Sequence, residues 1–154
     1  MTEMPEFTYR GARALTILHE KELYKFVTTW KKAKAAGVVL PESKKPDYQS
    51  MDTLLHHVFF WAREYMIWMC EKLQLPDPQI PPLPDAQAIE AEIDQYMVPF
   101  FAQYAKPLIG LPVKVFYFPT YQTTWKVDYC IDSMLEHLVV HAMRHAFQLE
   151  ELMS

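Results

Sequence analysis

The sequence has few glycines and few cysteines, and both shortages exclude familiar classes of site. Only 3 glycines occur in 154 residues, and the chain has neither a Gly-rich loop that could cradle a phosphate nor a Gly-x-Ser-x-Gly nucleophile elbow. The two cysteines, Cys70 and Cys130, form no spaced framework, and no neighbour acidifies either thiol. We therefore expect a reduced protein that uses neither a serine nor a cysteine nucleophile.

Basic clusters and long apolar runs are also missing. The formal net charge is −4 and there is no basic run, whereas proteins that bind nucleic acids carry clustered lysine and arginine. No stretch approaches the roughly 20 apolar residues that a membrane span needs. Residues 1–6 lack the basic start and the apolar core of a secretion signal. These absences predict a cytoplasmic protein that binds neither nucleic acid nor membrane.

What is present is the composition of a folded helical domain. The chain is 51% hydrophobic and 14% aromatic, and its 12 prolines gather largely between segments of helical periodicity. Those segments span residues 5–36, 48–74, 85–105 and 123–153. Half of the chain is too short to bury a sufficient core, so we expect one domain, residues 1–154. The predicted fold is all-α, a four-helix bundle with a long crossover connection, for which residues 38–46 provide enough chain.

Local signals predict the helix ends and one buried face. The residues expected to cap the second, third and fourth helices are, in turn, Asp47 or Ser50, Asp85, and Thr123 or Thr124. The buried stripe of the first helix is expected to contain Leu15, Leu18, Phe26, Trp30 and Ala33. Residues 107–124 are expected to be irregular, with room for a short extended or hairpin piece at 113–118.

Two histidines of the fourth helix occupy positions where a bundle helix normally carries leucine. His145 shares a heptad line with Ile131 and Leu138, and His141 shares the other core line with Met134. A buried imidazole without a partner loses its hydrogen bonds to water, so the placement needs compensation. A divalent metal is one such partner, because an i, i+4 histidine pair offers two nitrogens on one helix face.

A third histidine strengthens the metal hypothesis. His57 shares the core line of the second helix with Leu54 and Trp61, whereas His56 is rotated from that line by about 100°. Three imidazoles with one open position form the ligand set of a catalytic zinc-type centre, although imidazole also suits nickel, iron and copper. The alternative is a hydrogen-bonded pair of core histidines without a metal.

Two motifs of this chain resemble motifs of the DinB-like superfamily. The members of this superfamily are metal-binding four-helix bundles and include the YfiT-like proteins and thiol-dependent S-transferases. The first motif is His141-x-x-x-His145-x-x-Gln148-Leu149, and the second is Leu54-Leu55-His56-His57. The resemblance covers the whole chain in helix order, but only these two motifs are specific. It implies an all-α, DinB/YfiT-like fold.

The resemblance also implies a ligand set and an assembly. One divalent ion, commonly zinc or nickel, would be held by His57, His141 and His145, because the family ligand follows Leu-Leu-x and this selects His57 over His56. Similar proteins transfer bacillithiol or mycothiol to electrophiles, and many form homodimers. For a shared dimer surface, Tyr117, Tyr121 and Trp125 are the candidates that lie off the expected core lines.

Other titratable residues leave alternatives open. His137 lies one turn before His141, so these two could form the ligating pair, although we prefer His141 with His145. His19 and His56 are interpreted as partly exposed histidines with local hydrogen bonds. A base or a residue that orients a ligand could be Glu22, Glu64 or Tyr65, but each is better explained by a structural role, such as a salt bridge at the core edge for Glu22.

Three functional hypotheses follow. The leading one is a metal-dependent enzyme, either a hydrolase or a transferase that moves a low-molecular-weight thiol to an electrophile. The second is a non-enzymatic metal-binding or stress-response module, in which the ion stabilises the helices without reacting. The third is a structural dimer that binds no metal.

Overall fold

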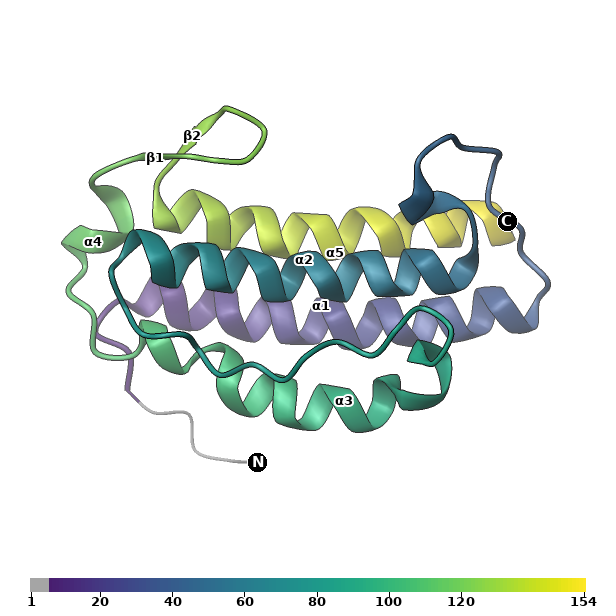
Figure 1. The fold of residues 1–154 in the computed structure, drawn as a ribbon, viewed down its shortest axis with the longest axis horizontal. Coiled ribbons are helices and arrows are strands. Elements are labelled where there is room, and N and C mark those ends of the chain that lie inside the picture. The colour runs from purple at the N-terminus through teal and green to yellow at the C-terminus, as the bar shows by residue number, and fades with distance from the viewer. Residues whose placement is uncertain (1–5) are drawn as a thin grey trace.

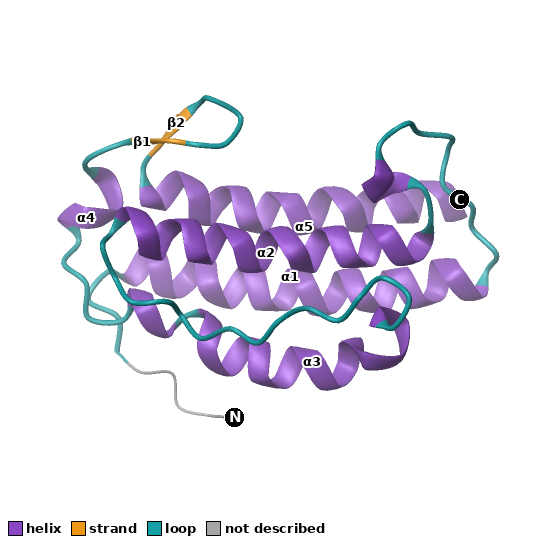
Figure 2. Ribbon diagram, viewed as in Figure 1, coloured by secondary structure: helices purple, strands orange, loops and turns teal. Residues whose placement is uncertain are grey.

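Four long helices carry most of residues 6–154, which are the residues that this computed structural model describes (Figures 1 and 2). They are α1 (Arg10–Ala35), α2 (Met51–Lys72), α3 (Ile89–Tyr104) and α5 (Ile131–Met153). The shorter elements are the 3-10 helices η1 (Pro46–Tyr48) and η2 (Lys106–Leu108), the one-turn helix α4 (Lys114–Tyr117), and the strands β1 (Tyr121–Gln122) and β2 (Asp128–Tyr129). The predicted all-α class is confirmed.

The long helices lie side by side in two directions. In Figure 1, α1 and α5 run one way while α2 and α3 run the other way. Direct contacts join α1 to α5, α5 to α2, α2 to α3 and α1 to α2. The two helices that carry the predicted ligands, α2 and α5, are therefore antiparallel neighbours.

The crossover connection was predicted in the wrong place. Residues 36–50 only reverse the chain, whereas residues 73–88 run along the length of the helices from the end of α2 to the start of α3 (Figure 1). Proline occupies five positions in this segment, which prevents a helix and favours extended backbone. The segment is fixed in place by Arg63, whose Nε donates to the carbonyls of Ile80 and Pro81, and by the Tyr96 hydroxyl, which also donates to Pro81.

The helix ends confirm one cap and correct two others. Ser50 caps α2 by accepting a hydrogen bond from the Thr53 amide, while the Thr53 hydroxyl accepts one from the Ser50 amide. The third helix begins at Ile89, four residues after the predicted start at Asp85. The last helix begins at Ile131, capped by Cys130 rather than by a threonine near residue 123.

A small hairpin explains why α5 starts late. Strands β1 and β2 pair antiparallel with Tyr121 opposite Tyr129, and Thr123 closes the turn by bonding both the amide and the carbonyl of Val127. Lys126 has a φ of 64°, a left-handed turn conformation that a helix cannot contain. The extended or hairpin piece for which residues 113–118 left room does not form there, because α4 occupies Lys114–Tyr117 and the hairpin lies after it.

The first helix begins at Arg10 rather than near residue 5, which itself lies outside the described residues. Its buried stripe is rotated slightly from the predicted one. Phe26, Trp30 and Ala33 are buried as expected, but Leu18 is 45% exposed. The prediction that His19 is partly exposed is wrong, because His19 lies in the core, 1% exposed, with its Nδ1 2.7 Å from the Tyr104 hydroxyl. His19 belongs to the buried stripe that the structure shows along α1, together with Thr16 and Leu23.

Within residues 6–154, none of the helices combines the length and the apolar character that crossing a bilayer would require.

Candidate metal centre

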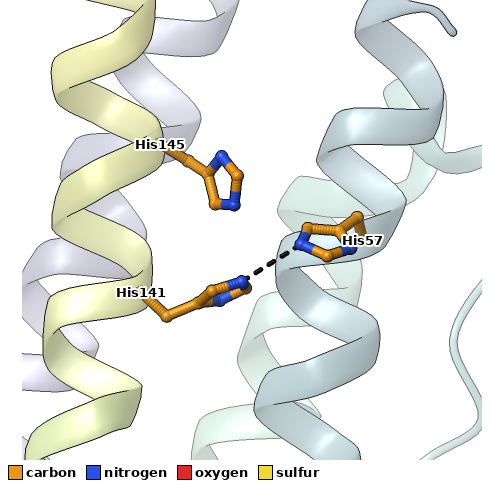
Figure 3. Close-up of side chains that lie close together, drawn as sticks. All are labelled: His57, His141 and His145. Atoms are coloured by element: carbon orange, nitrogen blue, oxygen red, sulfur yellow. Dashed lines mark hydrogen bonds between the residues drawn. The ribbon is translucent and has the colours of Figure 1, made fainter. Parts of the chain in front are cut away.

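The structure brings His57, His141 and His145 together between α2 and α5 (Figure 3). Each residue offers one ring nitrogen, and these three atoms lie within 4.8 Å of one another. Nε2 of His57 and Nε2 of His141 lie 3.1 Å apart. His141 and His145 reach the same place because positions four apart share a helix face, and His57 faces them from the neighbouring helix.

Polar side chains orient two of the three rings. Nδ1 of His57 lies 3.2 Å from Oδ2 of Asp47, and Nδ1 of His145 lies 3.2 Å from Oε1 of Gln148. A carboxylate or amide oxygen accepts a hydrogen bond, so in both rings the proton belongs on Nδ1 and Nε2 keeps its lone pair. Figure 3 shows the second ring nitrogen of His145 directed toward the other two rings. The lone pairs of these two rings therefore point into the cluster.

Burial keeps these imidazoles neutral. Loss of water around the charged form lowers the pKa of His57, His141 and His145, and it outweighs the nearby Asp47 carboxylate, which acts to raise the pKa of His57. The neighbouring imidazoles lower the pKa of His141 further. Since a metal binds only the neutral ring, this environment prepares all three nitrogens for coordination.

The donor set and its spacing fit a divalent ion. A tetrahedral ion with metal–nitrogen bonds of 2.0–2.1 Å separates its ligand atoms by about 3.3 Å, close to the 3.1 Å between His57 and His141. Without an ion, His141 donates its Nε2–H to His57, so the same geometry is also satisfied by a hydrogen bond. Three imidazoles suit zinc, nickel, iron or copper, and the arrangement does not choose among them.

Tyr48 is a neighbour of the cluster that the sequence did not reveal. Its hydroxyl lies 3.4 Å from Nε2 of His57, and its ring centroid is 5.9 Å from that of His145. Both Tyr48 and Asp47 belong to η1, the short helix just before α2. The sequence indicates Asp47 only as a candidate helix cap. Helical periodicity does not identify either residue as part of the site, because both lie in η1 and not on the face of a long helix.

The other histidines do not join the cluster. His56 is partly exposed and stacks on Phe60, as its rotation from the core line predicts. His137 is half-buried at the edge of the helices and stacks on Trp125, with ring centroids 5.0 Å apart. Its ring is 6.2 Å from that of His141 and is not part of the group that converges on His57.

The candidate bases have structural surroundings. Glu64 pairs with Arg63 at 3.2 Å, while burial raises the pKa of Tyr65 to about 12. Glu22 is half-buried, and within residues 6–154 it forms neither the expected salt bridge nor a hydrogen bond to a ligand histidine. None of the three touches the histidine cluster through a hydrogen bond that the described residues contain.

Comparison with known proteins adds no family name. No protein-family model matches the chain, and neither a curated protein nor a solved structure matches it. The resemblance to the DinB-like superfamily therefore stays a prediction.

Proposed function

We propose that this protein is a DinB-like four-helix bundle that holds one divalent metal ion, zinc or nickel, through His57, His141 and His145. The observation that carries the proposal is the convergence of three neutral imidazoles, two of them oriented by oxygen acceptors at Nδ1. Hydrogen bonds at the outer nitrogen are the usual support of metal-ligating histidines.

The favoured activity is a metal-dependent transferase or hydrolase. When bound, such an ion lowers the pKa of a coordinated water or thiol toward neutrality. The protein's own residues would do the rest: Asp47 and Gln148 hold the Nδ1 protons of two ligands, and the Tyr48 hydroxyl lies close enough to donate a proton to a group placed beside His57. A low-molecular-weight thiol and an electrophile are the substrates that the resemblance implies.

A second candidate, a metal-binding module without catalysis, is favoured by one specific observation. The Tyr48 oxygen is 3.4 Å from the His57 nitrogen, which is also a spacing at which two ligands of one ion can lie. Structural zinc sites are closed by four protein ligands, whereas catalytic sites keep one position open. A fourth ligand from Tyr48 would close the site and leave a metal-stabilised protein that does not react.

We also propose that the protein is a homodimer. Large apolar or aromatic side chains on the segment between α3 and α5 remain accessible, among them Tyr117 at 41% and Trp125 at 37% exposure. Tyrosine and tryptophan are enriched at protein interfaces. Tyr121, the third residue expected at this surface, is half-buried against Trp68.

Elemental analysis of protein purified without added metal tests the proposal directly. One equivalent of zinc or nickel per chain, removed by a chelator and restored by dialysis, is the expected result. A preparation that neither contains nor takes up a divalent ion would leave only the metal-free structural hypothesis. Screening the loaded protein against pairs of thiols and electrophiles then separates the enzyme from the non-catalytic module.

A further inference from the structure

A cavity of about 150 Å³ opens beside the histidine cluster, between α2 and the turn that joins β1 to β2. It shares no residue with the three histidines. Its walls are formed by Trp61, Glu64, Tyr65, Ile67, Trp68, Glu71, Thr123, Thr124, Trp125 and Met134. The chain has four tryptophans, and three of them line this cavity. The fourth, Trp30, is buried in the core and donates to the carbonyl of Met51.

Four of the ten residues that line the cavity are aromatic, and their rings come from two separate elements. Trp61, Tyr65 and Trp68 follow one face of α2 at helical spacing. Trp61 and Tyr65 are stacked with centroids 5.1 Å apart, and Trp125 from the hairpin meets Tyr65 edge-on at 5.7 Å. The hairpin therefore supplies a wall to a pocket whose other wall is a rigid helix.

Among residues 6–154, the charged groups that line the cavity are all carboxylates. Glu64 and Glu71 lie one heptad apart on α2, and no lysine, arginine or histidine is among the lining residues. Arg63 pairs with Glu64 from outside the cavity, which offsets part of its charge. The Lys72 ammonium already rests 6.0 Å from the Trp68 ring, so one aromatic face in this region does accept a cation.

Position connects the cavity to the candidate metal centre. The Tyr65 ring, which lines the cavity, lies 6.5 Å from the His141 ring and 5.3 Å from the His137 ring. Tyr65 is therefore adjacent to both the cavity and the histidine cluster, which places a small molecule held in the cavity close to His141.

We propose that this cavity binds the cationic end of a small organic molecule, a quaternary or tertiary alkylammonium group, and thereby positions the rest of that molecule at the histidine cluster. Aromatic faces attract cations electrostatically, and several rings around an alkylated ammonium are a known mode of recognition. The carboxylates of Glu64 and Glu71 also attract a positively charged group. The inference rests on the proposed function only in treating this molecule as a substrate, because binding in the cavity needs no metal.

Choline and 3,3-dimethylbutan-1-ol provide the first test, because they have the same shape and only choline is charged. Titration of each against the tryptophan fluorescence of the protein reports on the cavity, since the only tryptophan outside it is shielded in the core. We expect a saturable change with choline and about tenfold weaker binding of the neutral alcohol, the size of one good cation–π contact. Equal binding of the two, or no saturable change with choline, would overturn the inference.

Variants with matched controls localise the site. Trp125→Leu should abolish the choline response, whereas Phe147→Leu, at a residue of α5 that is 59% exposed and outside the cavity, should leave it unchanged. Glu71→Gln should weaken binding several-fold, and Glu136→Gln, an exposed change of the same charge on α5, should not. Circular dichroism establishes that each variant folds. A response that survives Trp125→Leu would place the cation elsewhere and contradict the proposal.

The same titration in the presence of a chelator, and in His145→Ala, separates the two proposals. Choline binding should persist in both. Protein that binds choline but no divalent ion would refute the proposed function and leave the cavity inference standing. Protein that binds the ion but not choline would refute the cavity inference alone.

Discussion

At the scale of single residues, the protein places four histidines in or against its core and gives each of them a polar or aromatic partner. His57 has Asp47, His145 has Gln148, His141 has His57, and His19 has the Tyr104 hydroxyl. A buried polar ring without such a partner would be strongly unfavourable. The nitrogens of His57, His141 and His145 converge on one another, whereas His19 faces the Tyr104 hydroxyl and does not belong to this group.

The choice of ligands can be tested by four alanine variants. His57→Ala and His145→Ala each leave two protein ligands, so we expect both to lose the ion. His56→Ala and His137→Ala remove rings outside the converging group and should retain it. With free metal a hundredfold above its dissociation constant, an ion bound at this site would stabilise the folded chain by about 2.7 kcal/mol. Thermal unfolding with and without chelator measures that difference, which should vanish in the first two variants.

Two results would contradict this assignment in different ways. Loss of the ion from His137→Ala together with its retention in His145→Ala would show that the pair on α5 is His137 and His141. Equal metal content in all four variants would show that the three histidines form a hydrogen-bonded core cluster and not a metal site.

His19 predicts a pH dependence that is independent of the metal. Burial lowers the pKa of His19 from 6.5 to about 3, so the unfolded chain takes up the proton first as the pH falls. The contribution of His19 to stability is therefore fully present above pH 6.5 and is lost between there and about pH 3. The loss approaches about 1.4 kcal/mol per pH unit.

Denaturant unfolding of the chelated protein measures this contribution. The control is the double variant His19→Leu with Tyr104→Phe, which removes both partners of the hydrogen bond and leaves no buried group unpaired. The free energy of unfolding of the parent should fall relative to the variant as the pH decreases from 6.5 to 4. Parallel curves would mean that His19 titrates normally.

At the scale of elements, helical periodicity predicted the four long helices but not their ends or connections. Ile89, Ile93, Tyr96, Phe100 and Tyr104 follow one another at helical spacing in the sequence, and all five are buried on one face of α3. The start of α5 was missed because Thr123 is an equally good cap for a helix and for the turn that it closes. The crossover was misplaced because length alone does not show whether a loop reverses or runs alongside the helices.

The short element η1 should control metal affinity through Asp47. Asp47→Ala removes the acceptor at Nδ1 of His57, and loss of such a partner typically weakens metal binding about 10–100-fold. Because the Asp47 carboxylate is exposed to solvent, we expect a loss of affinity near the lower end of that range. Isothermal titration with zinc measures the change, and Glu42→Ala, an exposed change of the same charge five residues earlier, is the control. Equal affinities of the two variants would remove Asp47 from the site.

At the scale of the whole molecule, the sequence was sufficient to identify the three converging histidines but not their surroundings. His57, His141 and His145 were found because each lies on the core line of a long helix, where periodicity determines direction. Asp47, Tyr48 and the cavity at Trp125 depend on how η1 and the hairpin fold back onto α2. Such tertiary contacts leave no periodic signal in the sequence.

The assembly state is the prediction that belongs to this scale. Each chain has a mass of 18.2 kDa, and light scattering at micromolar concentration should give about twice that value if the aromatic surface between α3 and α5 is an interface. The mass should stay constant over a concentration series for a stable dimer. A single-chain mass throughout the series would refute the dimer.

The separation of the histidines along the chain has a further consequence. His57 and His141 are 84 positions apart, so an ion shared between them acts as a reversible cross-link that closes a long loop. Closing such a loop in a disordered chain carries a large entropic penalty, whereas His141 and His145 need only one turn of helix. As the chain unfolds it should therefore release the ion from His57 first. A partly unfolded form would then hold the ion with low affinity through His141 and His145 on α5. The order in which the ligands are lost would report when α2 separates from α5.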